Sequence, residues 1–179
     1  EKIGGLVIWE ASWPLTPTLS PEGRGLGRGK RKELKVKGEA DEIIAKLDLR
    51  RHPEGGWFRE MWVDQATTAE GRAFGTAILF LLRDGETSHW HRIDATEIWH
   101  FHAGAPLVLS IAADEKGPVI DHRLGPDVLD GDVPQAIVPV MHWQAARSLG
   151  AWTLVGCTVS PGFRFEGFEL AAPDFDIAR

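Results

Sequence analysis

Short apolar runs separated by Gly, Pro and Asp turn signals recur along the second part of this chain, and their regular spacing is what most constrains its fold. Thr76–Leu82 and Trp152–Val159 are typical: each is long enough for one β-strand and too short for a membrane span. A single short helix is expected before them, where Ile43, Ile44 and Leu47 fall at helical spacing behind acidic residues. About eight such strands with intervening turns predict an all-β sandwich or barrel.

The composition is that of an ordinary globular chain of 179 residues, with 43% hydrophobic and 26% charged residues, long enough for one domain with a buried core. The net charge of −6 is divided unevenly: residues 1–38 carry eight Lys and Arg against four Asp and Glu, whereas residues 39–179 carry twelve against twenty-two. Nucleic-acid binding depends on Lys and Arg that neutralise phosphates, so this acidic body argues against it. We therefore expect neither a nucleic-acid nor a membrane partner.

The first 38 residues differ in composition from the rest. Pro14–Lys32 is rich in Pro, Gly and Arg without an apolar period, and the first Met of the sequence is Met61. This composition is typical of disorder, and the string PLTPTLSPEGRG resembles translated bacterial intergenic repeats. We predict that residues 1–38 are a disordered or spurious extension, that the natural start lies near Leu34–Glu39, and that residues 39–179 form a single domain.

The chain has one cysteine, Cys157, inside the apolar run WTLVGCTV. It cannot form an intrachain disulfide, and it has no basic neighbour in sequence that would activate the thiol. We predict a buried structural thiol and a reducing, cytoplasmic environment.

Candidate functional residues concentrate in the stretch Gly85–Gly104. His89 and His91 lie two apart, and in a β-strand such residues point to the same face. A hairpin turning at residues 93–96 would bring Glu97 beside both imidazoles. Two imidazoles and a carboxylate suit a divalent first-row metal with open coordination positions. The alternative is an ordinary hairpin whose polar residues bind nothing.

A second polar segment, His52–Gly56, reads HPEGG. Pro favours an extended or turn backbone before it, and two adjacent glycines permit a tight bend or a close backbone approach. The segment is therefore either a simple turn or the rim of a pocket that carries His52, Glu54 and Arg59.

Taken together, these motifs resemble the cupins, which are small double-stranded β-helix barrels of the jelly-roll type. The first cupin motif consists of a Gly, an HxH pair, a Glu and a further Gly, which correspond here, with slightly altered spacing, to Gly85, His89, His91, Glu97 and Gly104. In the second motif Gln144 stands where a fourth ligand His is expected. The resemblance implies a metal site of His89, His91, Glu97 and Gln144 for iron, nickel, manganese or zinc, with an amide that ligates such ions more weakly than imidazole.

The strings HPEGGWFRE, SHWHRIDATEIWHFHAG and GCTVSPGFRFEGFEL are similar to one cupin family of unknown function, sometimes labelled predicted sugar epimerases. The similarity extends from Leu47 to about Ala172. It implies a jelly-roll barrel with a short N-terminal helix and a homodimer, and it favours a pocket role for the HPEGG segment.

Three functions follow from these observations. The first is a metal-assisted enzyme that acts on a small polar molecule. The second is a metal-free sugar epimerase or isomerase with His91 as the base, although the chain has no Tyr, the residue that related nucleotide-sugar epimerases use as the acid. The third is a non-catalytic module in which Trp99, Phe101 and Trp143 line a pocket for a sugar or another small ligand.

Overall fold

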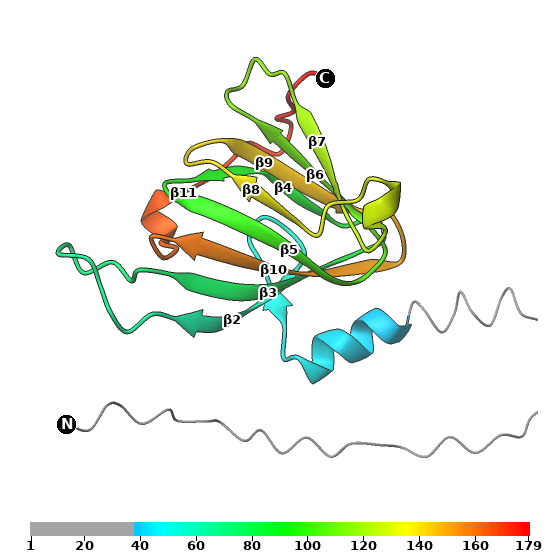
Figure 1. Ribbon diagram of the computed structural model, residues 1–179, viewed down its shortest axis with the longest axis horizontal. Coiled ribbons are helices and arrows are strands. Elements are labelled where there is room, and N and C mark those ends of the chain that lie inside the picture. The colour runs from blue at the N-terminus through cyan, green and yellow to red at the C-terminus, as the bar shows by residue number, and fades with distance from the viewer. Residues whose placement is uncertain (1–37) are drawn as a thin grey trace, which may run out of the picture.

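The computed structural model describes residues 38–179, which form two antiparallel β-sheets packed against each other and one short helix (Figure 1). The predicted all-β class with a short N-terminal helix is confirmed. The predictions made for residues 1–37 lie outside the described residues. In residues 38–179 no helix is long and apolar enough to cross a membrane.

The described chain begins with a helix over residues 38–46. The strands that follow are β1 (Arg50–Arg51), β2 (Trp57–Val63), β3 (Thr76–Arg83), β4 (Thr87–Ile93), β5 (Thr96–Gly104), β6 (Leu107–Ala112), β7 (Ile120–Leu124), β8 (Gln135–Val138), β9 (Trp143–Ser148), β10 (Trp152–Ser160) and β11 (Phe168–Leu170). Two short 3-10 turns, η1 (Val128–Asp130) and η2 (Phe165–Gly167), precede β8 and β11.

The six-stranded sheet has the order β1-β2-β3-β10-β5-β8, and the five-stranded sheet has the order β11-β4-β9-β6-β7. Strands that follow one another in sequence, such as β4 and β5 or β9 and β10, therefore lie in different sheets. The chain crosses repeatedly from one sheet to the other, which is the jelly-roll arrangement expected from the sequence.

The predicted hairpin between the histidine strand and the Glu97 strand is wrong. β4 carries His91 and pairs with β9, whereas β5 carries Glu97 and pairs with β10 and β8. The short connection after Ile93 changes sheets instead of reversing the strand within one sheet. His91 and Glu97 therefore approach each other from two sheets, as cavity neighbours and not as hairpin neighbours.

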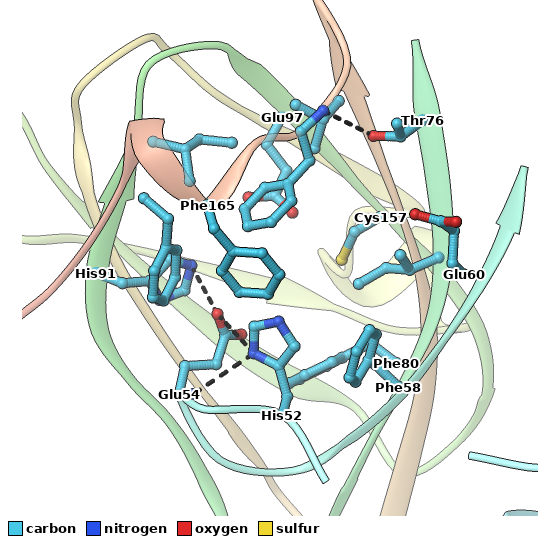
Figure 2. A pocket seen from close by; sticks show the side chains of 15 residues that line it. His52, Glu54, Phe58, Glu60, Thr76, Phe80, His91, Glu97, Cys157 and Phe165 are labelled. Carbon is cyan, nitrogen blue, oxygen red and sulfur yellow. Dashed lines mark hydrogen bonds and ion pairs between the residues drawn. The ribbon is translucent and has the colours of Figure 1, made fainter. Parts of the chain in front are cut away.

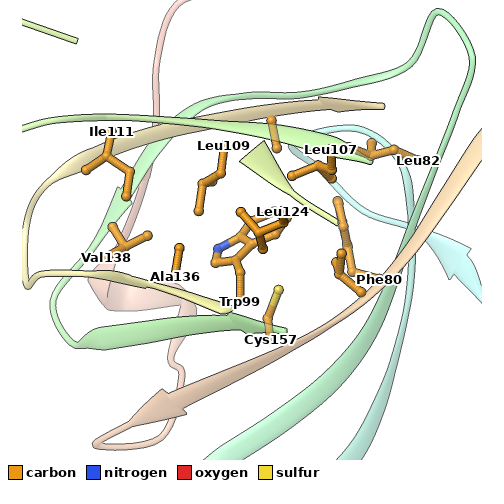
Figure 3. Close-up of a cluster of buried hydrophobic side chains, with 12 residues drawn as sticks. Phe80, Leu82, Trp99, Leu107, Leu109, Ile111, Leu124, Ala136, Val138 and Cys157 are labelled. Carbon is orange, nitrogen blue, oxygen red and sulfur yellow. The ribbon is translucent and has the colours of Figure 1, made fainter. Parts of the chain in front are cut away.

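The main hydrophobic core fills the space between the sheets (Figure 3). Trp99 of β5 is almost fully buried in it, and Leu107 and Leu109 of β6 pack from the other sheet. Complete burial of side chains of this size stabilises the fold by about 1.5–3 kcal/mol each. The helix contributes to a smaller cluster in which Ile44 packs with Leu81 of β3.

The HPEGG segment is a tight turn that docks the start of β2 onto β4 of the opposite sheet. The backbone N–H of His89 donates to the carbonyl of Glu54 at 2.8 Å. Gly55 has a φ of 111°, and a Cβ atom there would lie 2.1 Å from the carbonyl oxygen of Thr87. The glycine is required twice, for its positive φ and for this close backbone approach.

We predict that Gly55→Ala lowers the free energy of unfolding by about 3 kcal/mol, because the added methyl group meets backbone that cannot move aside. Gly131→Ala is the matched control: its φ of 95° is equally left-handed, but nothing lies within 4 Å of the added Cβ. The control should lose only about 1 kcal/mol, the cost of the backbone conformation. Urea denaturation measures both, and equal losses would show that the contact with Thr87 is unimportant.

Candidate functional site

Strands from both sheets and the segment after β10 enclose one cavity of about 80 Å³ (Figure 2). Most of its wall is apolar, and its polar groups come from a few strands and from the HPEGG turn. The lining residues are His52, Glu54, Phe58, Glu60, Thr76, Ile78, Phe80, His91, Ile93, Glu97, Cys157, Val159, Phe163, Phe165 and Phe168.

A buried carboxylate, that of Glu54, is the centre of the polar cluster in this wall. Its Oε2 atom lies 3.3 Å from Nδ1 of His52 and 3.3 Å from Nε2 of His91. Its Oε1 atom accepts a hydrogen bond of 2.9 Å from the hydroxyl of Ser88. Burial by itself raises the pKa of Glu54, but the charge of His91 and the hydrogen bonds from His52 and Ser88 outweigh it and hold the pKa below its ordinary value.

The hydrogen bonds of His91 determine where its protons lie. Nδ1 is 2.8 Å from the carbonyl oxygen of His89, and a carbonyl only accepts, so Nδ1 carries a hydrogen. Nε2 faces the carboxylate of Glu54. The contact is an imidazolium–carboxylate pair when Nε2 carries a proton and Glu54 is ionised. Both ring nitrogens of His91 are occupied.

His52 differs from His91 because only one of its ring nitrogens contacts the cluster. Nδ1 lies 3.3 Å from the carboxylate of Glu54 and accepts a long hydrogen bond of 3.4 Å from the backbone N–H of the same residue. Figure 2 shows the other nitrogen, Nε2, pointing toward the cavity. In the tautomer that carries its hydrogen on Nδ1, this hydrogen points at the carboxylate in place of the long bond from the backbone N–H, and Nε2 keeps a lone pair that a ligand can meet.

A second buried carboxylate, that of Glu97, is held by a chain of hydrogen bonds from β5 and β9. The indole N–H of Trp99 can only donate, and it does so to Oε1 of Gln144 at 2.9 Å. This contact fixes the orientation of the amide, whose Nε2 then donates to Oε2 of Glu97 at 2.6 Å. Burial and the nearby charge of Glu54 raise the pKa of Glu97, although His91 opposes them. Glu97 is the carboxyl that the site holds toward its protonated form.

Cys157 lies on the cavity wall that Glu97 also lines. Burial, with the charges of Glu97 and Glu54, raises the pKa of its thiol well above the ordinary value. The prediction of a buried thiol is confirmed.

The predicted convergence of His89 with His91 is wrong, and the reason is a β-bulge. Between Ser88 and His91 the register of β4 against β9 shifts, because three steps along β4 match two along β9. The extra residue reverses the alternation of faces at this point. Ser88 and His91 therefore both meet Glu54, whereas His89 turns to the outer face of the sheet, where its Nε2 lies 2.9 Å from the carbonyl of Ala172.

The structure divides the other predicted pocket residues into two groups. His52 and Glu54 line the cavity, as the pocket interpretation of HPEGG requires. The remaining four lie elsewhere. Arg59 donates to the carbonyl of Leu47 on the exposed side of β2, Trp99 and Phe101 pack in the main core, and Trp143 belongs to a separate cluster beneath the C-terminal segment.

Two features of the site were not found from the sequence. The sequence did not indicate Ser88, because a residue three positions before His91 faces the cavity with it only when a bulge lies between them. Phe163, Phe165 and Phe168 contribute a large part of the apolar wall. Their alternation with polar residues was an available signal, but it predicted only a closing strand.

The residues predicted to hold a metal do not fit one. Within residues 38–179 no group of three His, Cys, Asp or Glu side chains is placed to bind a metal ion. His89 lies on the other face of the sheet, and both nitrogens of His91 are engaged by neighbouring oxygens. The amide of Gln144 is committed to Trp99 and Glu97. Of the predicted set, only Gln144 and Glu97 are hydrogen-bonded to each other, whereas His91 contacts Glu54 and His89 lies on the outer face. The set does not fit a metal ion.

Comparison with known proteins agrees with the fold. Protein SO0799 from Shewanella oneidensis, known from an X-ray crystal structure, is 39% identical, with a TM-score of 0.70 over 74% of this chain and 84% of that chain. A hypothetical protein from Leishmania major is 30% identical, with a TM-score of 0.68 over 74% of this chain and 87% of that chain. Oxalate decarboxylase from Bacillus subtilis is 17% identical, with a TM-score of 0.51 over 69% of this chain and 30% of that chain, which shows a shared fold alone.

No curated protein sequence matches this chain significantly. The family model described as "Cupin superfamily (DUF985)" matches residues 41–171, which include the HPEGG turn, both sheets and every lining residue of the cavity. The chain therefore belongs to the DUF985 family of the cupin superfamily.

Proposed function

We propose that this protein binds a small molecule in the cavity between its sheets and moves a proton on it, as a metal-independent isomerase or epimerase. The observation that carries the proposal is a pair of buried carboxylates in one cavity, Glu54 and Glu97, whose surroundings shift their pKa values in opposite directions. Such a pair supplies one group that supports a base and one that serves as an acid.

The base in this proposal is His52. Its Nε2 points toward the cavity and its Nδ1 contacts Glu54, so the carboxylate stabilises the imidazolium that forms when Nε2 accepts a proton. The sequence favoured His91 for this role. His91 has no free nitrogen, and we assign it instead to holding Glu54 in place.

The acid is Glu97, which reaches the cavity from the six-stranded sheet. Epimerisation next to a carbonyl requires a base that removes the proton from carbon and an acid that returns one to the other face. Glu97 in its protonated form provides that second proton without a tyrosine, which this sequence does not contain. Because a carboxyl replaces the phenol, the absence of Tyr no longer argues against this chemistry.

The walls indicate the ligand class. Five phenylalanines face the cavity, and its charged groups are few. Aromatic faces pack against apolar groups and against the C–H face of a sugar ring, while a few polar groups set the orientation. We infer a small ligand with a carbonyl beside an acidic C–H bond and one apolar or sugar-like face. The same apolar wall favours the alternative function, a module that binds such a ligand without turning it over.

We predict that the protein catalyses exchange of a carbon-bound hydrogen with solvent in its ligand. Small aldoses, ketoses and keto acids would first be screened for binding by ligand-observed NMR, and binders would then be followed in D₂O. His52→Gln and Glu97→Gln should each slow deuterium incorporation by about 10²–10⁴-fold, the usual contribution of a general acid or base. His122→Gln, on β7 outside the cavity lining, should leave the rate unchanged.

Ligand binding without hydrogen exchange would identify a binding module and refute the catalytic proposal. Exchange that survives in His52→Gln would show that a different group is the base. Exchange abolished by a chelator and restored by a metal would overturn the metal-independent mechanism.

Glu97 should also make the stability of the protein depend on pH. Its pKa is higher in the folded protein than the ordinary 4.5, so the native state favours its protonated form. The stability that this provides is complete below pH 4.5 and is lost as the pH rises through the folded-state pKa. Glu97→Gln keeps the shape of the side chain but replaces the titrating carboxyl with an amide that does not titrate. We predict that the wild type loses stability relative to this variant on going from pH 4.5 to 8, measured by urea denaturation; parallel curves would refute this.

Glu54 should behave in the opposite way. The pKa of Glu54 is lowered from 4.5 in the folded protein. Its contribution to stability is therefore present above pH 4.5 and is lost as the pH falls through the folded-state pKa. We predict that Glu54→Gln costs about 3 kcal/mol at pH 7, since it removes the carboxylate around which His52, Ser88 and His91 are arranged in a buried cluster. The loss should shrink in acid. Glu60→Gln, an exposed carboxyl at the same cavity, should cost less than about 0.5 kcal/mol.

A further inference from the structure

A second hollow, which we call the outer groove, lies on the outer face of the five-stranded sheet and has a volume of about 270 Å³. Strands β4, β6 and β9 contribute to it, and the C-terminal segment, residues 171–179, forms one side. That segment, red in Figure 1, is fixed to the sheet: Asp176 accepts a 2.9 Å hydrogen bond from the indole of Trp90, and Ile177 is buried. The C-terminal segment is thus a fixed wall of the groove. The groove itself lies on the face of the sheet that points away from the central cavity.

The charge of the groove contrasts with that of the chain. Residues 39–179 carry ten more acidic than basic residues, yet the charged residues that line the groove are Arg147, Arg179 and Asp176. Arg179 pairs with Asp121, and Asp176 is occupied by Trp90. Arg147 forms no ion pair within residues 38–179. Among the described residues, it is thus a cation with no ion-pair partner, in a concave surface of an acidic domain.

Sheet register places suitable partners next to this cation. Arg147 is directly opposite Thr87 on β4 and Val108 on β6, so the three side chains lie in a row across adjacent strands. All three line the groove, as does Phe175 of the C-terminal segment. A guanidinium beside a hydroxyl is suited to an oxyanion, and Val108 and Phe175 provide apolar surface beside it.

We propose that the outer groove is a second ligand site, which binds a small molecule with a carboxylate or phosphate group and an apolar body. Arg147 and Thr87 hold the anionic group, and the apolar body packs on Val108 and Phe175. This site is separate from the proton-transfer site and does not depend on the function proposed for it.

The test is an NMR titration of the isotope-labelled full chain with benzoate, phenyl phosphate, inorganic phosphate and the neutral benzyl alcohol. We expect saturable shifts of the amides of Thr87, His89 and Arg147 with both aromatic anions, weaker binding of inorganic phosphate, and no saturation with benzyl alcohol. The stronger of the two aromatic anions identifies the preferred acidic group. Arg147→Gln should weaken the binding of aromatic anions about ten-fold or more, as the loss of one charge-assisted contact does.

Arg50→Gln is the matched control, since it removes one exposed positive charge from β1 in the other sheet and should not change the binding. Both arginines are exposed, so neither change should prevent folding. Binding that Arg147→Gln leaves unchanged, shifts that do not saturate, or equal loss in both variants would overturn the site. Equal binding of inorganic phosphate and phenyl phosphate would overturn the apolar part of the proposal.

Discussion

The buried carboxylate of Glu54 is the constraint on which the candidate site depends. A charge in an apolar interior is stable only when other groups replace the water it has lost. Here two imidazoles and a hydroxyl do so, and they come from separate parts of the fold: His52 from the turn before β2, and Ser88 and His91 from β4 of the other sheet. The carboxylate therefore connects the two sheets, and any change that separates them exposes an unpaired charge.

Backbone geometry makes that arrangement possible. The HPEGG turn approaches β4 so closely that Gly55 has no room for a side chain, and the approach carries Glu54 into the interior. On β4 the bulge lets Ser88 and His91 both face inward, although their odd separation would place them on opposite faces of a regular strand. One backbone irregularity thus builds the cluster and, in the same step, removes His89 from it.

The site is built on a cupin framework, but the residues at the metal-ligand positions of the motif contact other side chains of the protein instead of an ion. Gln144 orients Glu97 through a chain that begins at Trp99, a residue of the main core, so the position of this carboxyl is tied to the packing of the barrel. His91 neutralises Glu54 where the motif would have it bind an ion. The two carboxylates lie in one cavity and favour opposite protonation states, an arrangement suited to proton transfer. The outer groove uses the opposite face of the same sheet, where the residues that the bulge turned outward lie.

The sequence by itself determined the all-β class, the short helix and the buried thiol of Cys157, and it singled out His52, Glu54, His91 and Glu97 as candidate site residues. These follow from local patterns, because apolar periodicity, turn residues and the clustering of polar groups are readable along the chain. Only the tertiary structure decided that His89 faces outward, that His91 and Glu97 meet across two sheets, and that Trp99 and Trp143 are core residues. A bulge shifts one residue in register and a jelly-roll crossing changes the strand partner. Both depend on pairing with distant strands, which the local spacing of residues does not encode.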